Sequence, residues 1–176
     1  KEIAQSVGVS EAMLFRHFAT KDKLYAAILD DKVSQNGNHK FPWEGDEALL
    51  AAMRVKDDFT VFYTMAYRAL EKHQSDQGFL RLLLYSALEG HNLAEAFFRD
   101  FVSQIYTFLG NYIKERQADG VMREVDPRIV VRAFMGMMIH HSLNNILWDK
   151  RRHILEISNE EAARNFAEIL LRGVLK

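Results

Sequence analysis

The chain lacks cysteine, and this absence excludes several classes of protein. With no thiol among its 176 residues, it holds no disulfide scaffold, no thiolate zinc site and no cysteine nucleophile. Only two prolines, Pro42 and Pro127, and nine glycines interrupt the sequence. Because so few helix-breaking residues leave long uninterrupted stretches, the composition favours an all-helical fold.

Long apolar runs and an excess of charge of one sign are also missing. The apolar run at residues 134–139 is far shorter than the roughly 18 residues that span a bilayer. We find no signal peptide, so the sequence predicts a cytoplasmic protein with no membrane partner. The formal net charge is −1, so any binding of DNA must depend on a local basic patch.

The residues that are present indicate a globular protein. Apolar residues make up 48% of the chain, which is enough for a sizeable core. Their helical spacing predicts helices over residues 1–7, 10–17, 20–33, 46–73, 78–89, 92–120, 127–148 and 158–175. The clear loop covers residues 34–45. Since the chain opens inside a helical pattern without methionine, we expect a further segment before Lys1.

Residues that cap helices mark several of these boundaries. Asn92 with Glu95 resembles a capping box, and either Ser75 or Asp76 starts the helix before it. Gly8 stands where a left-handed residue ends a helix. Further helix starts are predicted at Ser10, Thr20, Asp46, Asp126 and Ser158.

The first 30 residues carry a helix–turn–helix pattern. Ala4 is small where the second helix crosses the first, and Gly8 permits the sharp turn. Val9 and Leu14 occupy the positions of a hydrophobic staple that fixes the angle between the helices. The outward side of the second helix is therefore free to enter a major groove of DNA.

This segment resembles the DNA-binding part of the TetR (tetracycline-repressor-like) family of bacterial transcriptional regulators. The residues that carry the resemblance are Ile3-Ala4, Val7-Gly8-Val9-Ser10, Leu14-Phe15, His17-Phe18 and Lys21-Asp22-Lys23-Leu24. The rest of the chain matches only in architecture. The resemblance implies an all-α protein with a helix–turn–helix domain at residues 1–33, whose first helix is missing. Residues 34–176 would form a helical domain for effector binding and dimerisation.

The resemblance also implies which residues contact DNA. Phosphates would lie near Ser10, Phe15, His17 and Lys21, and bases would face Glu11, Ala12, Met13 and Arg16. Family members usually have tyrosine in place of Phe15, so a hydroxyl contact is lost here. Ala12 and Met13 also depart from the family pattern, and their apolar groups suit thymine methyls.

Three of these residues also have a simpler interpretation that involves no DNA. Lys21 would be a solvated lysine at the start of a helix, and His17 would be a partly buried surface histidine. Arg16 would pair with Glu11 or with solvent instead of DNA.

An unusual supply of aromatic residues and methionines follows residue 46. Because the equivalent region of TetR-like proteins encloses a small-molecule pocket, the resemblance implies a small apolar effector. Ordinary core packing is the alternative for each of these residues. The candidates for contact with the effector are Phe59, Phe62, Tyr63, Tyr67, Tyr85, Phe98, Phe101, Tyr106, Met138 and His140.

The two helices predicted at the C-terminal end have features of a subunit interface. The helix over residues 127–148 is apolar almost all round, and the last helix is similar, with alanines and Gly173 that permit close approach. We therefore expect a homodimer joined by a four-helix bundle. The candidate dimerisation residues are Arg132, Met135, Gly136, Ile139, Leu143, Ala163, Phe166, Ala167 and Leu170.

An enzyme is the rival interpretation, but the sequence gives it no support. Motifs for zinc hydrolysis, nucleophilic serine, dinucleotides and phosphate loops are all absent. We expect no catalytic residues, no metal site and no cofactor. The basic run from Lys150 to His153 is interpreted as a solvated turn between helices, with anion binding as the alternative.

The sequence thus predicts a ligand-responsive transcriptional regulator, most simply a repressor. Its partners would be a palindromic double-stranded DNA operator, a second copy of the chain and an unknown small hydrophobic effector. One alternative is a helix–turn–helix regulator without a small-molecule effector. A helical enzyme is the weaker alternative.

Overall fold

The computed structural model describes residues 8, 10–34, 41 and 43–176, and all regular structure among them is helical. The elements in chain order are α2 (Glu11–His17), α3 (Lys21–Ser34), α4 (Glu47–Arg54), α5 (Asp58–Ser75), α6 (Gln77–Leu88), α7 (Asn92–Phe97), the π-helix η1 (Phe98–Val102), α8 (Ser103–Ala118), α9 (Pro127–Leu143), the π-helix η2 (Asn144–Trp148) and α10 (Asn159–Val174). The predicted all-α class is confirmed. The helix predicted over residues 1–7 and the staple residue Val9 lie outside the described residues.

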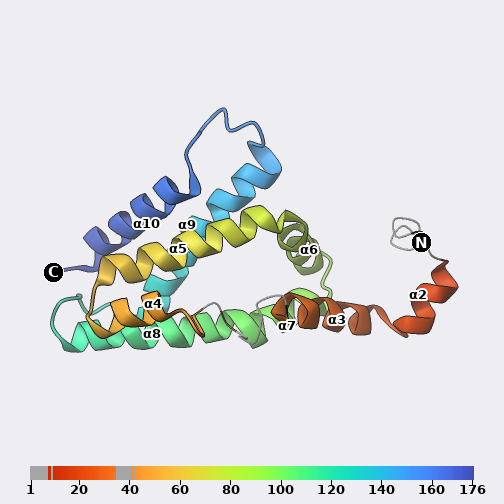
Figure 1. Cartoon of the computed structure of the whole chain (residues 1–176), viewed down its shortest axis with the longest axis horizontal. Helices are drawn as coiled ribbons and strands as arrows, with labels where there is room; N and C mark the ends of the chain where they lie inside the picture. The colour runs from red at the N-terminus through yellow and green to blue at the C-terminus, as the bar shows by residue number, and fades with distance from the viewer. Residues whose placement is uncertain (1–7, 9, 35–40, 42) are drawn as a thin grey trace.

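The molecule is elongated, with α2 at one end and α10 at the other (Figure 1). A helical body is formed by α4, α5, α8, α9 and α10. From this body α3, which packs on α7, leads to α2. This arrangement places the segment that resembles a DNA reader away from the core.

The core of the body lies where α5 meets α8, α9 and α10. Phe62 of α5 and Phe134 of α9 are fully buried, and their rings meet edge to face with centroids 5.2 Å apart. α10 has its most extensive contact with α5, and the alanines that it buries there permit the close approach. These buried alanines are Ala162, Ala163 and Ala167.

A buried ion pair joins the start of α5 to the end of α8. The Nε and Nη2 of Arg116 donate to the two carboxylate oxygens of Asp58 at 2.8 and 3.0 Å, and the Tyr112 hydroxyl donates to the same carboxylate at 2.6 Å. Burial and the hydrogen bond to Asp58 raise the pKa of Tyr112, and that carboxylate also raises the pKa of Arg116. Both groups therefore stay protonated, which keeps the buried carboxylate paired.

The single helix predicted over residues 46–73 is wrong, because α4 ends at Arg54 and α5 begins at Asp58. Between them Lys56 takes a left-handed conformation with φ 59°. Asp57 caps α5 by accepting the Thr60 N–H at 3.0 Å and its hydroxyl at 2.6 Å. The break is tolerated because the aspartate satisfies backbone donors that a new helix start exposes.

The capping box predicted at residues 92–95 is also wrong. The N-cap of α7 is His91, which makes no side-chain capping bond. Instead, Ser86 Oγ accepts a backbone N–H of α7 at 3.1 Å, and Asn92 Nδ2 donates to Asp22 of α3 at 3.2 Å. The side chain of Asn92, which the local pattern assigns to a helix cap, therefore makes a long-range contact with Asp22 instead.

The other predicted helix starts are confirmed. A side-chain oxygen accepts a backbone N–H two or three residues ahead at Ser10, Thr20, Asp46, Asp126 and Ser158. Of the two candidates before α6, Asp76 is the cap. Gly8 has φ 69°, a left-handed conformation that glycine adopts without steric cost.

Candidate nucleic-acid interface

α2 is a short helix whose described side chains are largely exposed. Ser10 caps it, since its Oγ accepts the Met13 N–H at 3.1 Å. Met13 is 50% exposed and Phe15 is 57% exposed, which is a large apolar surface for a helix of seven residues. The other exposed members of the predicted set are Ala12, Arg16 and His17. The side chain of Glu11 lies outside the described ones.

Lys21 stands at the first position of α3, directly after α2. Thr20 caps this helix by accepting the Lys23 N–H at 3.2 Å, and Lys21 is exposed. In the described part of the chain Lys21 makes no ion pair. A lone cation at a helix start is mildly unfavourable against the helix dipole, and a phosphate bound there would reverse that sign.

The exposed basic residues of this segment are the candidates for the local patch that a chain of nearly zero net charge would need to bind DNA. Arg16 and His17 occupy the last turn of α2, and Lys21 begins the next helix four residues later. The acidic neighbour Asp22 is held by Asn92 of α7. α2 and the start of α3, which carry these basic residues and the exposed Met13 and Phe15, lie at one end of the molecule (Figure 1).

Comparison with known proteins agrees with this geometry. Residues 1–28 match the family model described as "Bacterial regulatory proteins, tetR family". The match lies within the first 28 of 176 residues and spans every residue predicted to contact DNA. It supports a DNA-binding transcriptional regulator of the TetR family. No curated protein and no solved structure matches the chain.

α3 connects the TetR-family DNA-binding segment to the body through α7. Besides the bond from Asn92 to Asp22, the ring of Tyr25 lies 5.9 Å from that of His91. Both contacts involve the first turns of α3, close to α2. A shift of α7 would therefore act on the DNA-binding segment directly.

The residues predicted to bind an effector do not gather around one cavity. Phe62 and Met138 are buried in the core, whereas Tyr85 and Phe98 are more than half exposed. A third group stacks in a row along α5, with ring centroids 5.8 and 6.1 Å apart, and consists of Phe59, Tyr63 and Tyr67.

Three candidates remain, and they lie in different surroundings. Tyr106 is half-buried, and its hydroxyl accepts a hydrogen bond from Arg132 Nε at 3.2 Å. His140 is exposed beside Trp148, and Phe101 belongs to a row of rings described next. Helical periodicity had identified apolar faces, but it carries no information on whether two such faces enclose a space.

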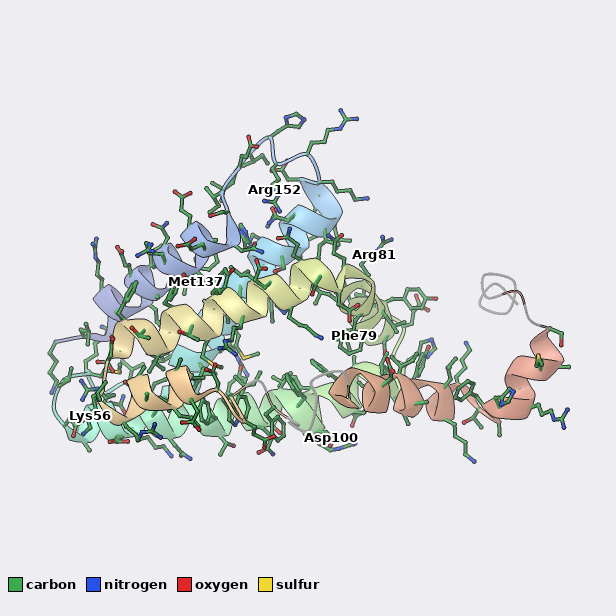
Figure 2. All side chains as sticks on the ribbon, viewed as in Figure 1. Lys56, Phe79, Arg81, Asp100, Met137 and Arg152 are labelled. Carbon is green, nitrogen blue, oxygen red and sulfur yellow. The ribbon has the colours of Figure 1, made fainter. Side chains whose placement is uncertain are left out.

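Sequence reasoning missed a continuous row of aromatic rings contributed by α6, α7, η1, the segment before α4, and α8. Consecutive centroids are 4.5 to 5.8 Å apart along the row Phe79, Phe97, Phe101, Phe41, Trp43 and Phe108. All six are half-buried, and only Phe101 belonged to the predicted set. Phe79 lies on the side of α6 that faces α7 (Figure 2). We call these six residues the aromatic row.

The candidate dimerisation residues fall into two groups. On α9, Arg132, Gly136 and Ile139 are exposed, and Met135 and Leu143 are half-buried. On α10 the residues turned into the protomer's own core are Ala163, Ala167 and Leu170, while Phe166 is half-buried against the ring of His141.

The outward face of α10 is thus a different one from the face that the sequence suggested. It carries Ile169, which is 61% exposed, together with Asn165 and Arg172. The alanine-rich face was correctly recognised as a place of close helix approach, but its partner is α5 of the same chain.

Among the described residues, no group of three or more histidine or acidic side chains is placed to hold a metal ion. None of the described helices is both long and apolar enough to cross a membrane.

Proposed function

We propose that the protein is a ligand-responsive transcriptional repressor that binds a palindromic operator as a homodimer. The observation that carries this proposal is the exposed surface of α2, with Arg16 and Lys21 beside it. In a dimer, two copies of α2 would enter successive major grooves. Arg16 and Met13 would then face base edges, while Ser10 and Lys21 would bind phosphates and fix the register.

The outward face of α9 supports the proposed dimer. Ile129 is 62% exposed, and Gly136 and Ile139 follow it on the same side of the helix. A side chain built at Gly136 would meet no atom within 4 Å, so the surface there is open. Ile169 adds an exposed apolar side chain on α10, and exposed apolar faces on these two helices suit the four-helix contact of two copies.

The aromatic row supports a response to an apolar effector. Its rings are half-buried, so they offer flat apolar surface that the core has not consumed. They include residues of α6 and α7, and α7 is the helix that contacts α3. An effector that favours one position of α7 needs a coupling of only about 1–3 kcal/mol to change operator affinity appreciably.

Selection of random duplex DNA by the full-length protein tests the proposal, with Arg16→Ala and Lys21→Ala variants alongside. We expect a two-fold symmetric site to be enriched. Losing Lys21 should weaken binding to all sequences and reduce the salt slope by about 1, whereas losing Arg16 should relax base preference. Arg54→Ala, an exposed arginine of α4, is the control and should leave the selection unchanged.

Weak, salt-sensitive retention with no enriched sequence would contradict the proposed operator binding. Enrichment of a site without two-fold symmetry would support sequence-specific DNA binding but contradict the proposed dimer.

A regulator without a small-molecule effector is the second candidate. It is favoured by the scatter of the ten predicted effector residues, which do not share a cavity. Thermal melting with a panel of hydrophobic compounds separates the two, because a ligand that binds the native state raises the melting temperature with its concentration. No rise with any compound, together with intact operator binding, would favour the second candidate.

A further inference from the structure

A polar cleft of about 300 Å³ lies where the end of α5, α6, η2 and the loop after η2 meet. Three cationic side chains line it: Arg81 of α6, and Lys150 and Arg152 of the loop (Figure 2). Neutral hydrogen-bonding groups complete the wall, among them Gln74, Ser142 and Asn145. No carboxylate is present among the described residues that line this cleft.

These cations lack the counter-charge that surface cations often have. In the described ranges neither Arg81 nor Lys150 makes an ion pair, and Arg152 donates from Nη1 to the Ile157 carbonyl at 3.2 Å. The neighbouring carboxylate of Asp149 is occupied, because its two oxygens accept the backbone N–H groups of His153 and Ile154 at 2.7 and 2.9 Å. Asn159, which also lines the cleft, donates from Nδ2 to the Glu71 carboxylate at 2.7 Å, so that carboxylate is occupied too. The lining residues themselves carry three cations and no carboxylate.

The backbone around the cleft is locally unusual in two places. Arg152 adopts a left-handed conformation with φ 53°, which is costly for a residue with a side chain, and its N–H donates to the Asp149 carbonyl at 2.8 Å. Asn145 and Ile146 line the cleft from the π-helix η2. Such features persist where the surroundings impose them and are frequent at functional sites.

His141 is a buried residue in the lining of the cleft, and its pKa responds to the positive charge nearby. Burial, and to a smaller extent the charges of Arg152 and His140, lower the pKa of His141. The neutral ring of His141 is hydrogen-bonded to the Asn145 amide, with 3.0 Å between the two nitrogens. This part of the lining is therefore uncharged, and the positive charge of the cleft comes from Arg81, Lys150 and Arg152.

We propose that this cleft binds a small oxyanion, a phosphate or a carboxylate group, between the guanidinium groups of Arg81 and Arg152. Guanidinium groups match both kinds of oxyanion with paired charge-assisted hydrogen bonds, and Lys150 adds a point charge. The volume leaves room for a small organic part beside the anionic group. The basic run after η2 is thus half of a binding site rather than a solvated turn. The site lies away from α2 and is independent of the proposed operator binding.

Isothermal titration of the full chain with inorganic phosphate and, separately, with citrate tests the proposal at constant ionic strength. We expect saturable binding of at least one probe, and the stronger of the two identifies the source of the oxyanion. Arg81→Gln and Arg152→Gln should each weaken that binding by roughly tenfold, as expected for a lost charge-assisted bond. Arg151→Gln is the matched control, because Arg151 is adjacent and exposed but does not line the cleft.

The titration is repeated on an Arg16→Ala, Lys21→Ala double variant to separate the cleft from the DNA interface. Binding that survives in the double variant and is lost in Arg152→Gln belongs to the cleft. The proposal is overturned if neither probe binds saturably up to about 10 mM, a range that detects even millimolar affinity. Equal weakening by Arg151→Gln and Arg152→Gln, with each variant melting like the parent in chloride, would also overturn it.

Discussion

His73 near the end of α5 is a half-buried histidine that should make stability depend on pH. Its Nδ1 lies 2.9 Å from Ser142 Oγ, and burial lowers the pKa of its ring from the ordinary value of 6.5. The unfolded chain therefore binds a proton that the folded chain resists. Stability from this residue is fully present above pH 6.5 and declines as the pH falls below that value.

Replacing His73 by glutamine should make this decline shallower while keeping a polar partner for Ser142. Melting temperatures between about pH 5 and pH 7.5, where an ordinary histidine titrates, provide the measurement. Some slope should persist, because burial also lowers the pKa of His141. His153→Gln is the control, since His153 is exposed. An unchanged slope in His73→Gln, or a chain that gains stability on acidification, would contradict the prediction.

At the scale of the element, the break between α4 and α5 depends on one cap. Asp57→Ala should lower the free energy of unfolding by about 1 kcal/mol, because two hydrogen bonds to Thr60 are lost at a helix start. Asp57→Ser should retain most of the stability, since serine is also a good N-cap. Urea denaturation of the three proteins measures the difference. Equal stability of the alanine and serine variants would show that the cap is not what holds the break.

The elements also show where sequence reasoning succeeds. Helix starts with a short polar residue and nearby backbone donors, such as Ser10 and Ser158, were predictable because capping is a local interaction. The Asp57 cap was missed because apolar periodicity continues through it, from Leu49 to Phe62. Asn92 was misassigned because its partner, Asp22, lies 70 residues away in sequence. Local patterns cannot report such a contact.

At the scale of the whole molecule, the proposed dimer makes a prediction at Gly136. Gly136→Arg should leave the protomer folded, because Gly136 is exposed and a Cβ added there meets no atom within 4 Å. The long charged side chain should prevent close approach of a second copy. We expect a monomer by light scattering and much weaker operator binding. The matched control is Gly78→Arg, a helical glycine of α6 that is equally open.

A Gly136→Arg protein that remains dimeric would show that the α9 face is not the subunit contact. Loss of the dimer in Gly78→Arg as well would point to a general effect of the added charge.

The candidate DNA-binding residues could be predicted because a short motif of fixed spacing carries them. The packing inside the body could not be predicted in this way. The same helical spacing of apolar residues is found whether the face packs on α5, on a partner subunit or on a ligand. Ala163 and Ala167 show this ambiguity: their small size signalled close packing correctly, but not with which helix. The aromatic row escaped detection because Phe41 and Trp43 come from outside any helix.

The contacts of α3 with α7 determine where the body is linked to the DNA-binding segment. Asp22 and Tyr25 are only a few residues from the end of α2, so the contact between α3 and α7 lies close to the DNA-binding helix. A displacement of α7 would therefore reach α2 through a short length of chain. In the proposed dimer, a small displacement of each copy of α2 would be enough to change the spacing between them. The two helices would then no longer match successive major grooves of the double helix.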